Sequence, residues 1–407
     1  MEERLIIRNF GPISDMDVVI RPCTIFIGSQ GSGKSTAAKV LTICRDLSWY
    51  LSIINHDDDV LEPFKKFCID EYFKVDTYLH YTDIDGLIEV VFRGGRFELK
   101  TVSLSLEDTK ALLSDKILRE NKSLLESLGV NDVSKEDLQN QQLYAPLLRA
   151  NSRMMLYIPA ERNLAGSMSK ALASMIVAKI PLYDALIEYM SVFEKAKNEF
   201  KEYYVPFLNV SFSFNNGNER IWLGQGENRH NPLPMQSCSS GLQSVLPLLM
   251  SIDYALKVNY FDSFVIEEPE QNLFPSNQRE LLYHLVETYN LTNFRGMVLT
   301  THSPYILSCM NVMLLAGLLV EKDGLYEKVV RVIGENRNLN PTDVAVYRLN
   351  PSAEKFCVDL KNPNTGLIGI NELDSASESI GEDYDQLYKL YIQELRRNNV
   401  DWNRSHR

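Results

Sequence analysis

The sequence lacks the features that mark an exported, membrane-spanning or disulfide-stabilised protein. Its longest apolar run, around residues 312–320, is too short to cross a bilayer. The first residues, Met-Glu-Glu-Arg, contain no basic segment followed by an apolar core, the pattern of an export signal. The six cysteines are scattered and form no C-x-x-C pair, so we expect buried free thiols. These absences predict a cytoplasmic protein with no membrane partner.

Positive charge is also scarce. The chain has 42 lysines and arginines against 54 aspartates and glutamates, which gives a net charge of −12. This balance argues against a surface broadly covered in nucleic-acid-binding charge, although it leaves room for a local basic groove. With 407 residues, of which 45% are hydrophobic, the chain can form two or three cores or one large α/β domain with insertions.

The most informative stretch is a glycine-rich turn between an apolar strand and a helix. Residues 23–27 are typical of a buried strand, and Gly28, Gly33, Lys34 and Ser35 fit G-x-x-x-x-G-K-[ST]. In such a loop, glycines allow backbone N–H groups to point at phosphate oxygens, and the following helix presents its positive end. We predict that this Walker A loop binds a nucleoside triphosphate with Mg²⁺. The residues predicted to bind it are Gly28, Ser29, Gln30, Gly31, Ser32, Gly33, Lys34, Ser35 and Thr36.

Two later strands end in side chains suited to the other half of a phosphate site. The apolar strand at 261–266 runs into Glu267 and Glu268. Such a pair suits one acid that holds Mg²⁺ through its water shell and a second that orients the attacking water. The strand at 296–299 is followed by His302, which would place an imidazole near the γ-phosphate.

Two weaker signals have more than one interpretation. Small residues at 236–244 lead into a helix, which suits an anion at its N-terminus, although a helix cap is the ordinary explanation. The strand at 154–158 is followed by Glu161 and Arg162. Arg162 either senses a phosphate with Glu161 holding it, or the two form a structural ion pair.

Taken in chain order, these motifs resemble the head of ABC-type ATPases of the SMC, RecF and OLD group. The resemblance begins with Asn-Phe-Gly-Pro-Ile at 9–13 between two strands, and it continues through Walker A, S-S-G-x-Q, E-E-P-E and T-H-S-P. It implies an α/β fold: a mixed sheet with a P-loop core, a helical and strand insertion, and a helical lobe.

The resemblance also implies roles for individual residues. Glu268 would be the catalytic carboxylate, and Glu267 would bind Mg²⁺ together with Ser35. His302 would be the switch histidine, and Ser240-Gly241 the signature that closes on ATP bound to a partner subunit. The group usually has aspartate at the position of Glu267, and its glutamine loop cannot be placed in this sequence.

The resemblance to this group also divides the chain into five expected parts. We expect the first part of the ATPase core at 1–54, an insertion at 55–150, and a core strand with a helical lobe and hairpin at 151–235. The second part of the core is expected at 236–320, and closing strands with a C-terminal helix that docks a partner at 321–407. The finer expectations are two strands in 78–99 turning at 93–96, helix through 165–205, a hairpin at 209–223, and closing strands at 344–349 and 367–370.

The forms Ile-Pro-Ala-Glu-Arg-Asn and Glu-Glu-Pro-Glu-Gln-Asn-Leu-Phe-Pro resemble the OLD-like ATPases of bacterial anti-phage systems such as Septu and PARIS. That resemblance implies an ATPase whose copies share composite ATP sites and which gates a separate effector, a nuclease or toxin. The alternative is a RecF- or Rad50-like DNA-repair or chromosome-associated ATPase, so nucleic acid stays open as a partner. The acidic balance and the absence of long heptad arms weigh against it. A transporter subunit is a third reading, which the Asn-Phe-Gly-Pro start and the large insertions disfavour.

A nuclease domain of the OLD type is not expected. Asp383 and Asp385 form a D-x-D pair with Glu372 upstream, as a Toprim nuclease requires. However, 375–395 has helical spacing, and too few residues follow the strand at 296–299 for that domain.

Overall fold

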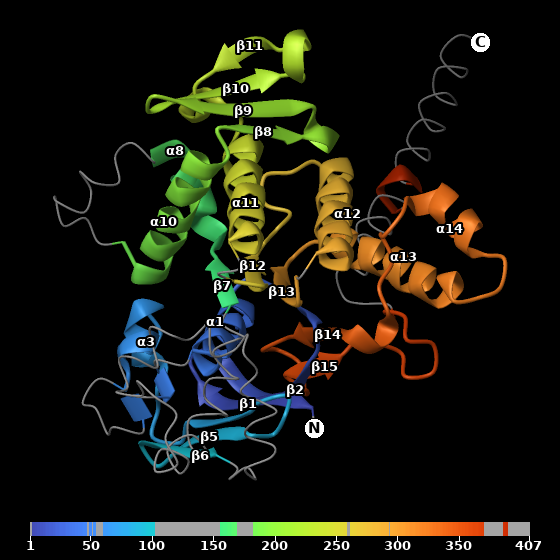
Figure 1. Cartoon of the computed structure of the whole chain (residues 1–407). Helices are drawn as coiled ribbons and strands as arrows, with labels where there is room; N and C mark the ends of the chain where they lie inside the picture. Colours follow the sequence, from blue (N-terminus) through green and yellow to red (C-terminus); the bar gives the residue numbers. More distant parts are fainter. Residues whose placement is uncertain are drawn as a thin grey trace, which may run out of the picture.

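A mixed sheet, parallel except for one edge strand, lies at the centre of the molecule and carries the P-loop (Figure 1). The computed structural model describes residues 2–46, 49–50, 52–53, 60–101, 155–168, 182–258, 261–292, 294–369 and 386–389. The central strand order is β15-β14-β3-β13-β12-β7, and only β15 is antiparallel to its neighbour. The bounds are β3 Cys23–Ile27, β7 Met155–Ile158, β12 Ser263–Glu267, β13 Gly296–Thr301, β14 Val344–Leu349 and β15 Cys357–Asp359.

A second, antiparallel sheet lies on one side of the central sheet, with helix α1 between the two (Figure 1). Its order is β2-β1-β4-β5-β6. The bounds are β1 Glu3–Phe10, β2 Ile13–Ile20, β4 Tyr78–Thr82, β5 Ile88–Arg93, β6 Arg96–Thr101 and α1 Lys34–Cys44. Alternate residues of the central strands, among them Phe26, Val265 and Val298, join this core. Burial on both faces explains why these strands are almost wholly apolar.

Helices cover the other face of the central sheet, and a third sheet lies beyond them (Figure 1). This core includes Ile25, Ile266 and Leu299 from the strands. The long helices are α10 Asp184–Glu199, α11 Ser240–Lys257, α12 Pro275–Leu291 and α13 Pro304–Val320. The third sheet has the order β11-β10-β9-β8, from β8 Glu202–Val205, β9 Val210–Asn215, β10 Asn218–Leu223 and β11 His230–Leu233. Shorter helices are α3 Glu62–Lys66, α8 Asn163–Met168 and α14 Tyr326–Ile333.

The predicted α/β class with a P-loop core is confirmed, as are the hairpin at 209–223 and the strand at 344–349. Residues 78–101 form three strands instead of two, because a turn at Asp83–Gly86 divides the first half. Of these strands β4 pairs with β1, and β5 and β6 extend the sheet beyond it. Residues 202–205 are a strand and not helix, since Glu-Tyr-Tyr-Val pairs with β9.

Of the strand predicted at 367–370, the described residues 367–369 contribute an isolated bridge from Ile368 to Lys361, and β15 pairs at the edge of the sheet instead. The six cysteines form no disulfide, but only Cys23 and Cys44 are buried and Cys68 is exposed. Glu372, Asp383 and Asp385, most of the insertion at 55–150 and nearly all of the C-terminal helix lie outside the described residues. Within the described part of the chain, no helix has the length and apolar character needed to cross a membrane.

Candidate functional site

The strand register brings the predicted motifs to one edge of the central sheet. Thr301 of β13 is level with Ile27 of β3, and Glu267 of β12 is level with Thr300. The last residue of β7, Ile158, is level with Ile266 of β12. The residues that follow these strands therefore meet at their carboxyl ends, which is where parallel α/β sheets place ligands.

Close contacts behind the Walker A loop account for two of its glycines. A Cβ at Gly28 would lie 2.2 Å from the backbone oxygen of Leu349 in β14. Gly33 has φ +95°, and a Cβ there would lie 2.7 Å from Cγ1 of Ile13 at the start of β2. The loop is thus fixed from behind, while Ser35 and the residues 29–31 are exposed at its front. This leaves the front of the loop open to a ligand.

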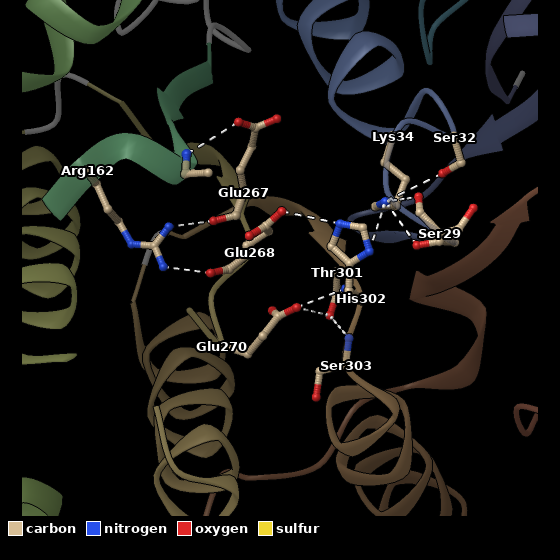
Figure 2. A network of polar contacts seen from close by, with 12 residues as sticks. Ser29, Ser32, Lys34, Arg162, Glu267, Glu268, Glu270, Thr301, His302 and Ser303 are labelled. Carbon is tan, nitrogen blue, oxygen red and sulfur yellow. Dashed lines mark hydrogen bonds and ion pairs between the residues drawn. The ribbon is translucent and has the colours of Figure 1, made fainter. Parts of the chain in front are cut away.

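Lys34 is a buried cation bound by neutral oxygens. Its Nζ donates to the backbone oxygens of Gly28 at 3.0 Å and Ser29 at 2.9 Å, and lies 3.4 Å from Ser32 Oγ (Figure 2). Burial lowers the pKa of Lys34 to about 8, against the opposing negative charges of Glu268 and nearby acids. Because no carboxylate of the described residues pairs directly with this ammonium, a phosphate that reached it would gain a strong ionic contact.

His302 links Lys34 to Glu268. Its Nε2 lies 3.3 Å from Oε1 of Glu268, and its Nδ1 lies 3.5 Å from Nζ of Lys34 (Figure 2). This order of groups fits a neutral imidazole that accepts from the ammonium and donates to the carboxylate. The hydrogen bond from His302 lowers the pKa of Glu268, although its partial burial opposes that shift. Glu268 is therefore held in its ionised form.

Glu267 presents a buried oxygen that the described residues leave unsatisfied. The residue is 4% exposed, and its Oε2 accepts from the backbone N–H of Ala160 at 3.3 Å. Its Oε1 has no partner at normal hydrogen-bond geometry in the described part of the chain, although the Tyr157 hydroxyl is close enough to interact with this carboxylate. Burial, with the charge of Glu267 second, keeps the pKa of the nearby Tyr157 well above 10. An unpaired buried carboxylate oxygen is costly, and a bound cation would satisfy it.

These residues fit Mg²⁺ in the manner of a nucleotide site. No group of three or more His, Cys, Asp or Glu side chains among the described residues is arranged to hold a metal ion. Mg²⁺ beside phosphates takes only one or two protein ligands and completes its shell with phosphate oxygens and water. Glu267 and the exposed Ser35 hydroxyl at the start of α1 are suitable ligands of this kind.

Glu270 fixes the histidine from behind, which the sequence reading did not predict. Its Oε1 accepts from Oγ1 of Thr301 at 2.7 Å and from the backbone N–H of His302 at 2.9 Å. Ser303 in turn donates its backbone N–H to Oγ1 of Thr301 at 2.9 Å. The available signal was a third acid in the E-E-P-E motif, two residues after Glu268.

Arg162 follows neither of its two predicted interpretations. Its guanidinium is completely buried and makes no ion pair with Glu161, whose Oε2 accepts from the Tyr183 hydroxyl at 2.7 Å. Instead, Nη1 donates to the backbone oxygen of Glu267 at 2.5 Å, and Nη2 donates to that of Glu268 at 2.6 Å (Figure 2). The arginine therefore binds the main chain of the acid pair.

The predicted signature lies apart from this network. Ser240 is exposed and opens α11, and a Cβ on Gly241 would lie 2.8 Å from the backbone oxygen of Asn272. In the described part of the chain, neither residue makes a hydrogen bond to the P-loop, Glu268 or His302. The structure thus joins the P-loop, the two acids and the histidine, while Ser240 is exposed at the start of α11 and Gly241 is buried against Asn272.

An α/β sheet with a glycine-rich phosphate loop, paired acids and a histidine at adjoining strand ends defines a P-loop domain of the ATPase class. Residues 23–308 match the family described as "AAA domain, putative AbiEii toxin, Type IV TA system". Because this match spans well over half of the chain, the protein belongs to that family. No curated protein matches the chain at a significant level.

Several solved structures are similar in outline. The SMC head domain from Thermotoga maritima is 11% identical, with a TM-score of 0.36, covering 76% of this chain and 92% of that chain. The Smc head domain with an extended coiled coil from Pyrococcus furiosus is 12% identical, with a TM-score of 0.32, covering 75% and 90%. A dimeric ATP-binding cassette bound to ADP and Pi is 10% identical, with a TM-score of 0.29, covering 88% and 99%. Scores this low support no assignment of residues or partners.

Proposed function

We propose that this protein hydrolyses ATP to ADP and phosphate with Mg²⁺ as cofactor. The observation that carries the proposal is the continuous line of contacts from Lys34 through His302 to Glu268. These residues come from three segments far apart in the sequence, and they meet in front of the phosphate loop. The buried, unsatisfied oxygen of Glu267 supports the metal requirement.

Each group has a definite part in the proposed reaction. Lys34 and the backbone N–H groups of the loop bind the phosphates. Mg²⁺, when held by Ser35 and Glu267, supplies positive charge to the phosphate oxygens. Glu268 orients a water molecule and accepts its proton as the water oxygen bonds to the γ-phosphorus. The bond from that phosphorus to the bridging oxygen breaks, and ADP leaves. His302 keeps Glu268 ionised and links it to the lysine at the γ-phosphate.

We further infer that ATP sites are completed between copies, in a dimer or a larger homo-oligomer. The support is Ser240, exposed at the start of an 18-residue helix, which makes no hydrogen bond to its own P-loop among the described residues. Backbone N–H groups at such a helix end suit the phosphates of a nucleotide bound to another copy. The five-part division at 54, 150, 235 and 320 belongs to the same proposal.

The role we propose for the ATPase is to gate a separate effector, a nuclease or toxin, in anti-phage defence. The family description, which names a toxin–antitoxin system, supports a link to toxin control. The motif forms at 158–163 and 267–275 resemble those of PARIS- and Septu-like ATPases. A second catalytic constellation is not found in the described part of the chain, which favours an effector encoded elsewhere.

The ATPase proposal is tested with Glu268→Gln. The change removes the proton acceptor and keeps its size, so kcat should fall about 10²–10⁴-fold while ATP binding persists. Hydrolysis at the wild-type rate would overturn the assignment of Glu268. Wild-type protein that binds ATP but never turns it over would overturn the proposed activity.

The gating role needs a different experiment. Tagged Glu268→Gln protein, purified from its host with and without phage infection, is analysed by mass spectrometry. A nuclease or toxin bound in one condition and released in the other would support gating. Recovery of DNA and repair proteins alone would favour the RecF-like alternative.

A further inference from the structure

One guanidinium binds two successive carbonyl groups at the catalytic edge of the sheet. In an extended strand, successive carbonyls point in opposite directions and cannot share one donor group. Glu267 is the last residue of β12, and Glu268 has φ +43°, in the left-handed region. This turn of the chain brings both carbonyl oxygens to the same side, where Arg162 binds them. The two hydrogen bonds therefore depend on the left-handed conformation of Glu268.

The chemistry of Arg162 suits this task better than any other side chain. A guanidinium is planar and rigid, so its two terminal nitrogens reach two acceptors at a fixed spacing. Nη1 also donates to the backbone oxygen of Pro159 at 3.2 Å, which fixes the guanidinium against the loop that carries it. The same segment, through the backbone N–H of Ala160, holds the side chain of Glu267. The loop after β7 thus binds both the main chain and a carboxylate of the acid pair.

We propose that Arg162 is a positioning residue for ATP hydrolysis, which holds Glu268 in the left-handed conformation that directs its carboxylate at His302. The inference rests on the proposed function and deepens it. A residue with a Cβ populates this conformation reluctantly. On its amino side, the backbone N–H of Glu268 is anchored to the Thr300 oxygen at 2.8 Å. On its carbonyl side, Arg162 makes the corresponding anchor. Without it, the chain at Glu268 relaxes and the carboxylate leaves its place beside His302.

The test is Arg162→Lys, which keeps the positive charge but loses the two terminal guanidinium nitrogens at their fixed spacing. Misplacement of a catalytic group by about 1 Å costs roughly a hundredfold in rate, so we expect kcat to fall about 10- to 100-fold. The KM for ATP should stay within about twofold, because the P-loop is not altered. Turnover is expressed per nucleotide-binding chain, so loss of folded protein does not count. Arg45→Lys is the matched control, because the Arg45 side chain is only 11% exposed but is bound to Glu3 at the other end of α1.

A double-mutant cycle separates positioning from general stability. If Arg162 acts through Glu268, the Arg162→Lys, Glu268→Gln double variant turns over no more slowly than Glu268→Gln alone. Multiplied effects, or an unchanged kcat in Arg162→Lys, would overturn the inference and leave the ATPase proposal intact. A Glu268→Gln variant as fast as wild type would instead overturn the ATPase assignment. Arg162→Gln, whose side-chain amide retains a single NH₂ donor group, is the second variant. Failure of both variants to fold would show a purely structural role.

Discussion

The two ends of helix α1 hold largely buried cations in opposite ways. At the C-terminal end, Arg45 donates to both carboxylate oxygens of Glu3, at 2.7 and 2.6 Å, and Tyr81 donates to the same carboxylate at 2.7 Å. At the N-terminal end, Lys34 is bound by carbonyl and hydroxyl oxygens, and its acids stay at longer range. A cation paired with a carboxylate already has its charge neutralised, whereas a cation held by neutral acceptors can still bind an anion.

Arg162 extends the comparison beyond α1. Like Lys34 it is buried, and like Lys34 it is bound by backbone carbonyls. The difference lies in their surroundings, since Lys34 is 4% exposed and lies beside the exposed residues 29–31 and Ser35, whereas Arg162 is 0% exposed. We therefore assign ligand binding to one and positioning to the other.

Removing the Arg45–Glu3 ion pair at the C-terminal end of α1 should destabilise the protein without changing its affinity for ATP. Arg45→Met leaves the Glu3 carboxylate buried and without its cation, which typically costs about 3–5 kcal/mol in the free energy of unfolding. Urea denaturation measures the loss, and ATP affinity per folded chain should be unchanged. Glu3→Gln with Arg45→Met is the control, because removing both charges should recover much of that loss. A tenfold change in ATP affinity in Arg45→Met would contradict the separation of the two ends.

The reverse result is expected at the other end. Lys34→Met removes the ammonium that meets the phosphates, and ATP affinity should fall at least about a hundredfold, which is about 2.7 kcal/mol. Stability should not fall, since a partly desolvated cation is replaced by an apolar chain of similar length. Isothermal titration gives the affinity and thermal unfolding the stability. Lys39→Met is the matched control on the same helix, because Lys39 donates to the backbone oxygen of Phe67. Equal losses in both variants would argue against a special role for Lys34.

The contrast also shows which features a sequence can reveal. The P-loop, the acids and His302 were predictable because each motif is contiguous and each follows an apolar strand. The Glu3–Arg45 pair joins residues 42 positions apart, with no local pattern to mark it. The role of Arg162 depends on the register of β7 against β12 and on a left-handed residue in another segment. The strand at 202–205 was missed because its neighbours have helical spacing, and pairing with β9 decides its structure.

The pH dependence of ATP binding should report the buried state of Lys34. Its pKa is lowered to about 8 in the free protein, and a bound phosphate would raise it again. ATP binding is then coupled to proton uptake above pH 8, so affinity should fall about fivefold between pH 8 and pH 9. The stability of the ATP-free protein should move the other way. Between pH 8 and about 10.5 the unfolded chain holds more protons at this lysine, so its contribution to stability rises with pH. An ATP affinity that is flat from pH 8 to 9 in the wild type, or that falls equally in Lys34→Arg, would refute this coupling.

Two glycines of the P-loop should show how much of their cost on substitution comes from backbone strain and how much from steric contact. Gly31 has φ +75° and a Cβ there would meet nothing within 4 Å, whereas Gly33 has φ +95° and contacts Ile13. Gly31→Ala should therefore cost only the left-handed penalty, about 1 kcal/mol in the free energy of unfolding. Gly33→Ala should cost more, because its methyl group also pushes on the start of β2. Since the Gly33 Cβ meets Cγ1 of Ile13 at 2.7 Å, adding Ile13→Ala should reduce the excess cost in Gly33→Ala but not the cost in Gly31→Ala. Equal costs for the two glycines would mean that the β1–β2 turn does not hold the loop, and that the N-terminal end of α1 is fixed by its backbone alone.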